Sequence, residues 1–177
     1  MTDSASAPPL PSLPRYDAPP RLAGGQPLLV AQVADAALTS ELAERLGVAV
    51  QTLEVLDAAA HPGPAALQRA LLERLGRASV GLQLYLSGDE AFLWPLHALA
   101  RNAGLAADEI HLLRHGEGRR AVYCVHCASL QAGGTGDVHD CQRCGVRLEV
   151  RRHFSRRLGA YLGVCADADR PYAEGRA

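Results

Sequence analysis

Apolar and polar positions along residues 25–118 predict strands and helices in alternation. The continuous apolar run Leu28–Ala31 is typical of a strand that is buried on both faces, and the helical pattern Ala36–Leu46 ends at a glycine. Leucines spaced by four residues form one face of a second helix over Ala65–Leu75. Further strands are expected over Val48–Leu56, Val80–Leu86 and Ile110–Leu113, and a third helix, which contains Pro95, over Asp89–Ala103.

Strands that alternate with helices of this length predict an α/β fold: a small parallel sheet with flanking helices and right-handed crossovers. The remainder of the chain has a different pattern. Residues 1–24 contain six of the eleven prolines and no apolar periodicity, so we expect a flexible proline-rich arm. Short β-type runs surround a group of cysteines further on. We therefore expect an α/β domain over 25–118, a β-rich cysteine domain over 119–166 and a tail over 167–177.

Charge is divided unevenly between these parts. Residues 1–118 contain eight arginines and thirteen acidic residues, whereas residues 119–177 contain ten arginines and six acidic residues, for a net charge of −1. A chain with this balance lacks the general electrostatic attraction to nucleic acid of a strongly basic protein. Lysine is absent, which excludes a Schiff-base lysine and a P-loop.

The apolar runs are too short to span a membrane, which takes about 18 apolar residues. The proline-rich N-terminus also lacks the apolar core of a secretory signal peptide. We therefore expect a cytoplasmic protein, in which cysteines serve metal or redox chemistry before disulfides.

Four of the five cysteines form two Cys-x-x-Cys knuckles, Cys124/Cys127 and Cys141/Cys144, separated by thirteen residues. Each knuckle directs two sulfurs at the same ion, so the spacing predicts one tetrahedral metal site. Four thiolates leave no coordination position for water, which favours a structural zinc ion (Zn2+) over a hydrolytic one. Two disulfides, four free thiols, or iron in a rubredoxin-like site remain as alternatives.

A basic run follows the second knuckle. Arg151, Arg152, Arg156 and Arg157 lie within seven residues and are interleaved with aromatic and imidazole side chains. Such a run can bind phosphate, carboxylate or a haem propionate, or it can simply be the solvated surface of a strand. Signatures of catalysis such as Gly-x-Ser-x-Gly, His-Glu-x-x-His and Cys-x-x-Cys-His are absent from the sequence, so we expect no catalytic residues on this chain.

The two knuckles, the run from Arg152 to Arg157 (Arg-His-Phe-Ser-Arg-Arg) and the run from Gly159 to Gly163 (Gly-Ala-Tyr-Leu-Gly) carry a family likeness. The segment from Tyr123 to Asp167 resembles the C-terminal domain of the small, A-type subunit of bacterial dimethylamine monooxygenase. The resemblance implies a complex with haem on another subunit, and a flavin and iron–sulfur reductase that delivers electrons from NADPH. It further implies the oxidation of dimethylamine to methylamine and formaldehyde.

A weaker resemblance covers residues 28–116. The run Leu84–Gly88, the helix after it and Asp108–Leu112 are similar to the last βαβ unit of the nicotinamide lobe of ferredoxin reductases. That family has a glycine-rich loop after the first strand of the lobe, whereas this chain has Gln32–Asp35, without glycine and with one negative charge. The phosphates of a dinucleotide would meet Cβ atoms and a carboxylate there, so we expect a degenerate lobe that has lost dinucleotide binding.

We therefore expect a non-catalytic subunit of a haem-dependent monooxygenase, in which a zinc ribbon presents a basic strand to the haem-bearing or reductase subunit. The residues expected to dock the partner are Arg152, His153, Phe154, Arg156, Arg157 and Tyr161. Two alternatives are a rubredoxin-like electron carrier and a zinc-ribbon protein that binds nucleic acid.

Overall fold

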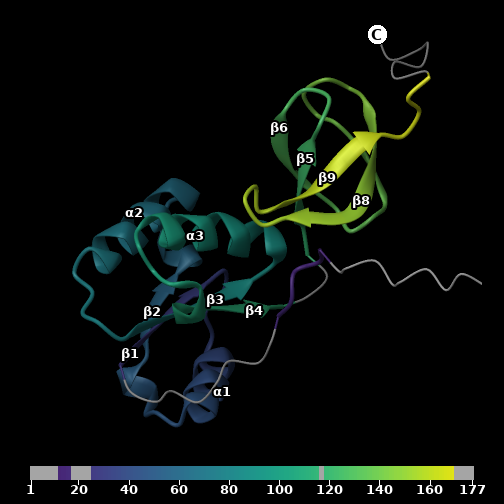
Figure 1. Cartoon of the computed structure of the whole chain (residues 1–177). Helices are drawn as coiled ribbons and strands as arrows, with labels where there is room; N and C mark the ends of the chain where they lie inside the picture. The colour runs from purple at the N-terminus through teal and green to yellow at the C-terminus, as the bar shows by residue number, and fades with distance from the viewer. Residues whose placement is uncertain (1–11, 17–24, 116–117, 170–177) are drawn as a thin grey trace, which may run out of the picture. The chain divides into compact units, whose positions relative to one another are not determined.

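The computed structural model describes residues 12–16, 25–115 and 118–169 (Figure 1). Most of the predicted arm (1–24) and the end of the predicted tail (170–177) lie outside these residues. The chain forms two compact units. The α/β unit comprises the described residues of 16–121 together with 132–135, and the ribbon unit comprises 122–131, 136–169 and the segment 12–15.

The α/β unit is built on a four-stranded sheet in the order β2-β1-β3-β4, in which every neighbouring pair is parallel. Three helices follow the first three strands in turn, so the unit is a series of strand–helix repeats. The expected fold class, a small parallel sheet with flanking helices, is confirmed. The strands and helices are β1 (Gln26–Ala31), α1 (Ala36–Leu46), β2 (Glu54–Asp57), α2 (Pro64–Leu75), β3 (Leu82–Gly88), α3 (Glu90–Asn102) and β4 (Ile110–Arg114).

Alternate residues of β1 supply the two faces of this sheet, as the pleat of a strand requires. Leu28 and Val30 pack with the leucines of α2 and α3 on one face. Leu29 and Ala31 pack with α1 on the other face. All four residues are fully buried, which explains why β1 is a continuous apolar run rather than an alternating one.

The structure corrects the predicted starts of two strands. The expected strand Val48–Leu56 begins only at Glu54, because a 3-10 turn over Val50–Thr52 takes up the residues before it. The strand expected from Val80 begins at Leu82, after a turn that leaves Val80 fully exposed. The third helix, α3, is continuous and contains Pro95, as expected.

The ribbon unit is built on a five-stranded sheet in the order β6-β5-β9-β8-β7. β5 and β9 are parallel, whereas β8 is antiparallel to both β9 and β7. Its apolar interior is small and is formed mainly by Val122, Val146, Leu148, Val150, Phe154 and Tyr161. The strands are β5 (Arg120–Cys124), β6 (Ser129–Gly133), β7 (Val138–Asp140), β8 (Arg147–Ser155) and β9 (Ala160–Cys165).

Candidate metal centre

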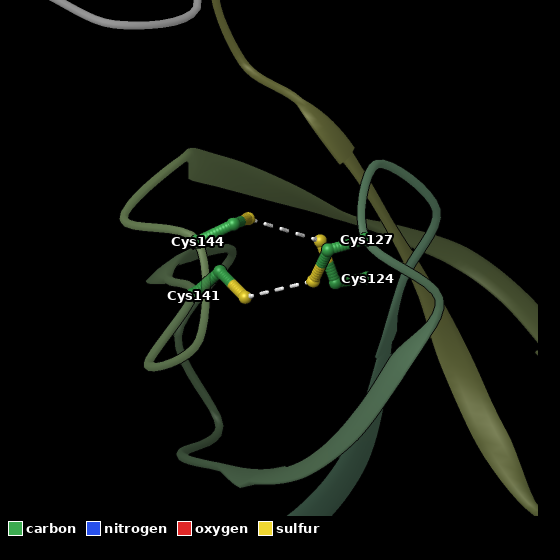
Figure 2. A group of neighbouring side chains, drawn as sticks. All are labelled: Cys124, Cys127, Cys141 and Cys144. Carbon is green, nitrogen blue, oxygen red and sulfur yellow. Dashed lines mark hydrogen bonds between the residues drawn. The ribbon is translucent and has the colours of Figure 1, made fainter.

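The four knuckle cysteines come from two loops of the ribbon unit. Cys124 ends β5 and Cys127 lies in the turn that leads to β6, while Cys141 and Cys144 lie in the turn between β7 and β8. Figure 2 shows the two pairs facing each other across a short gap, with all four sulfurs directed inward. The expected cluster of four cysteines is therefore present, although its members are up to twenty residues apart in sequence.

The sulfur positions fit a tetrahedral metal ion. The Sγ atoms of Cys124 and Cys144 are 3.8 Å apart, those of Cys127 and Cys141 are 3.7 Å apart, and all four lie within 4.8 Å of one another. A regular tetrahedron with metal–sulfur bonds of about 2.3 Å has edges of about 3.8 Å. All five cysteines are free, with no disulfide among them. The four cysteines can thus hold one metal ion with little rearrangement.

Both knuckles use the same backbone conformation after their second cysteine. Gly145 has φ 71°, in the left-handed region that glycine adopts without strain. Ala128 occupies the equivalent position of the first knuckle and has φ 55°, and it is the one non-glycine with positive φ among the described residues. A left-handed alanine costs about 1–2 kcal/mol. The backbone strain of the first knuckle therefore lies at Ala128.

Burial makes one thiol of each knuckle a weaker acid. Burial raises the pKa of Cys124 to about 12, although the backbone N–H groups of Cys127 and His126 oppose this shift. Burial likewise raises the pKa of Cys144 above its ordinary value. A divalent ion that binds here must therefore displace protons from these two thiols.

The other thiol of each knuckle is the stronger acid. Burial raises the pKa of Cys141, but the backbone N–H groups of Cys144 and Arg143 outweigh it and bring the pKa down to about 5. The Ser129 hydroxyl is the largest influence on Cys127 and lowers the pKa of that thiol. Each knuckle thus has one thiol whose pKa lies below the ordinary value for cysteine.

Two side chains beside the cluster carry no signal in the sequence. Ser129 Oγ lies 3.1 Å from Cys127 Sγ and 3.6 Å from Cys141 Sγ. Gln131 accepts a hydrogen bond of 2.9 Å from the backbone N–H of Gln142, inside the second knuckle. Serine and glutamine on a short edge strand are unremarkable in sequence, and their contacts with the second knuckle form only where the two loops meet.

The nearby histidines and the fifth cysteine are not members of the cluster. His126 is exposed, and His139 is half-buried on β7 with an Nε2 atom that has no hydrogen-bond partner among the described residues. The Cys165 thiol donates to the carbonyl oxygen of Asp167 at 3.0 Å. Within the described part of the chain, the four knuckle cysteines are the one group of three or more potential ligands close enough to share an ion.

The basic run is divided between a strand and a turn. Arg152 and His153 lie on β8, whereas Arg156 and Arg157 lie in the tight turn between β8 and β9, and all four are exposed. We expected a single arginine-lined strand, so this part of the prediction is corrected. The strand ends at Ser155 because Leu158 N–H donates to the carbonyl oxygen of that residue and closes the turn.

A β-bulge explains why adjacent basic side chains are both exposed. The register of β8 with β9 shifts between Val150, opposite Gly163, and Phe154, opposite Tyr161. Three residues of β8 therefore face a single residue of β9, which breaks the alternation that would bury Arg152.

The two aromatic residues of the predicted docking set lie in the interior. Phe154 and Tyr161 are 4% and 8% exposed, and their rings pack edge to face with centroids 5.1 Å apart. These two rings are buried on the strands that flank the turn, so a partner that approaches this surface contacts the arginines and His153 instead. We call the exposed residues Arg152, His153, Arg156 and Arg157 the basic turn.

At the carboxyl edge of the α/β sheet, polar side chains hydrogen-bond to neighbouring groups of the same chain. Gln32 accepts a hydrogen bond of 2.8 Å from Asp89 N–H, and its amide donates to the Asp89 carboxylate at 3.4 Å. Asp35 caps α1 through Leu38 N–H, and Asp89 caps α3 through Phe92 N–H. The helix N-termini that bind phosphate in dinucleotide-binding lobes thus carry carboxylate caps here.

No helix among the described residues is long and apolar enough to cross a lipid bilayer.

Comparisons with known proteins agree with the family likeness of the cysteine segment. Residues 121–164 match the family described as "Dimethylamine monooxygenase subunit DmmA-like, C-terminal domain". A curated protein of Ectopseudomonas mendocina (strain ymp), "Heme-dependent oxidative N-demethylase delta subunit", is 53% identical over 163 residues, which make up 91% of this chain and 91% of that protein. No solved structure matches the chain.

Proposed function

This chain belongs to the family of heme-dependent oxidative N-demethylase delta subunits, and from this premise we propose that it is an accessory, non-catalytic subunit of such an enzyme. The likeness over 91% of both chains is the observation that carries the proposal. The substrate we propose is dimethylamine, after the description of the matching C-terminal family. The haem, the flavin and the iron–sulfur centre belong to partner subunits, and we place the complex in the cytoplasm, where metal-binding thiols stay reduced.

The four cysteines hold a structural zinc ion in this proposal. The Sγ–Sγ distances match a tetrahedron, and four sulfur ligands leave no open position for a substrate or water. When bound, the ion supplies no chemistry to the substrate and instead fixes the two loops that carry the cysteines. The same sulfurs fit iron, which would make the chain an electron carrier. Iron-loaded protein is coloured and bleaches with dithionite, whereas zinc-loaded protein is colourless.

The basic turn is the surface that we propose for docking. Its arginines are exposed at the end of the β8–β9 hairpin, and residues 151–157 contain four arginines and no acidic side chain. Guanidinium groups pair with carboxylates in a bidentate manner, so the turn fits an acidic surface on the haem-bearing or reductase subunit. The second knuckle precedes β8, and Cys124 of β5 lies opposite Gly163 of β9, so the cysteines and this hairpin belong to one sheet.

The docking proposal is tested by charge reversal. The double variant Arg156→Glu/Arg157→Glu should lose co-purification with the other subunits while it keeps its bound metal, since neither side chain contacts the cysteines. The matched control is Arg69→Glu/Arg77→Glu, which makes the same charge change at exposed positions of the α/β unit. Retained assembly of the first variant, or equal loss of assembly in both, would contradict docking through the basic turn.

A further inference from the structure

The hydroxyl of Ser129 lies against the sulfur cluster. Its Oγ atom is 3.1 Å from Cys127 Sγ, within the range of a hydrogen bond to sulfur, and 3.6 Å from Cys141 Sγ. Ser129 is the first residue of β6 and is half-buried, so strand pairing holds its backbone in place. Its side chain therefore contacts one sulfur from each knuckle.

The two knuckles differ in the donors that surround their sulfurs. Cys124 and Cys141 are the first cysteines of the two knuckles, and the sulfur of each accepts hydrogen bonds from backbone N–H groups of its own knuckle. Cys144 is the second cysteine of its knuckle, and its sulfur accepts a hydrogen bond from the backbone N–H of Val146, two residues further on. The matching position in the first knuckle is Ser129, where the donor is a side chain and can be removed without a change in the backbone.

A donor at this position matters because of charge. Four thiolates around a divalent cation carry a net charge of −2 in a partly buried site, and each hydrogen bond to a sulfur spreads that charge. Hydrogen bonds to ionised acceptors are roughly twice as strong as neutral ones. Groups that hydrogen-bond to metal ligands typically contribute 10–100-fold to metal affinity.

We infer that Ser129 is a positioning residue of the metal centre, and that its hydroxyl donates to the Cys127 thiolate and strengthens metal binding by the four cysteines. This inference rests on the proposed metal site. It concerns one hydroxyl, so it is tested separately from the presence of the metal.

The test compares Ser129→Thr with Ser129→Val, two side chains of nearly equal shape that differ in the hydroxyl. Zn2+ affinity, measured on the full-length chain by competition with a chromophoric chelator, should stay within about threefold of wild type for threonine and fall about tenfold for valine. Ser155→Ala is the matched control, because it removes a hydroxyl that lies in the same sheet and accepts a hydrogen bond from Leu158 N–H.

Cobalt substitution gives a second readout that a purely structural role would not move. Loss of a hydrogen bond raises the energy of the sulfur electrons, so the sulfur-to-cobalt charge-transfer band of Ser129→Val should shift to lower energy. The band of Ser129→Thr should stay at the wild-type position. Equal affinities and identical bands for the two variants would overturn the role of Ser129 while leaving the metal site intact. Wild-type protein that binds neither Zn2+ nor Co2+ would overturn both the metal site and this inference.

Discussion

The two units of this chain are stabilised in different ways. The α/β unit buries a leucine-rich core on both faces of its sheet, with Leu28, Leu71, Leu84, Leu86 and Leu93 all at 0% exposure. The ribbon unit has few large buried apolar side chains and instead brings four cysteines together. A small β-rich unit cannot bury enough apolar surface to fold by that means alone. In the function proposed here, one chain therefore combines a unit held by apolar burial with a unit that depends on sulfur–metal bonds.

The largest effect should come from removing the metal. Metal binding supplies on the order of 10 kcal/mol of folding free energy to structural sites of this kind, so a chelator should unfold the ribbon unit. Limited trypsin digestion should then cleave at the arginines between 143 and 157, while residues 25–115 stay protected. The one tryptophan, Trp94, lies buried on α3 and should keep its fluorescence. Protection of the arginines after complete metal removal would contradict this division.

A substitution that leaves a cavity in the α/β core should destabilise the α/β unit and leave the ribbon unit intact. Leu71 is fully buried on α2, and Leu71→Ala should lower the free energy of unfolding of the α/β unit by about 2–5 kcal/mol. Denaturation followed by Trp94 fluorescence measures this loss. The metal content should not change. Loss of the metal together with the stability would mean that the two units depend on each other.

A smaller effect is expected at the strained knuckle. Ala128→Gly removes a left-handed strain of about 1–2 kcal/mol but adds about 0.5–1 kcal/mol of backbone entropy cost, so Zn2+ affinity should rise a few-fold. Gly145→Ala is the mirror experiment and should lower the affinity by a similar factor. A Cβ atom at Gly145 meets no atom within 4 Å, so its cost is conformational. Unchanged Zn2+ affinity in both variants would show that metal binding does not depend on the backbone conformation of these turns.

The smallest effect concerns pH and the α/β unit alone. Burial lowers the pKa of His111, which stacks on Tyr85 and has its Nε2 atom 2.8 Å from the Gln83 amide oxygen. Below the ordinary pKa of 6.5 the unfolded chain therefore takes up a proton that the folded chain resists, and stability falls with falling pH until the folded pKa is passed. His111→Gln should flatten this slope in Trp94-monitored denaturation. If the substitution leaves the pH dependence of stability unchanged, that dependence comes from other titratable groups.

The sequence predicted most where physical constraints act locally. The apolar run of β1 and the four-residue leucine spacing of α2 identified a parallel α/β layer, because burial on both faces requires such patterns. The glycine after Leu46 placed the end of α1 correctly, and the spacing of the knuckles identified the cysteine cluster. Errors fell at Val50–Thr52 and Val80, where turns interrupt runs that are apolar enough to form a strand.

The ribbon unit was harder to predict because its features depend on pairing between distant strands. The bulge that exposes Arg152 follows from the register of β8 with β9, and a period-two pattern cannot show an extra residue. The burial of Phe154 and Tyr161 follows from the same pairing. Ser129 contacts Cys141 Sγ only because the two knuckle loops meet, and a serine two residues after a cysteine does not by itself indicate a role at a metal site.

Metal analysis of the purified full-length chain is the measurement on which the proposal depends. Elemental analysis together with visible absorption should find one zinc ion per chain, no iron and no colour, and a protein with serine at all four knuckle positions should bind none. Wild-type protein without a stoichiometric metal ion, or a four-serine variant whose ribbon unit still resists trypsin, would show that sulfur–metal bonds do not hold this unit together.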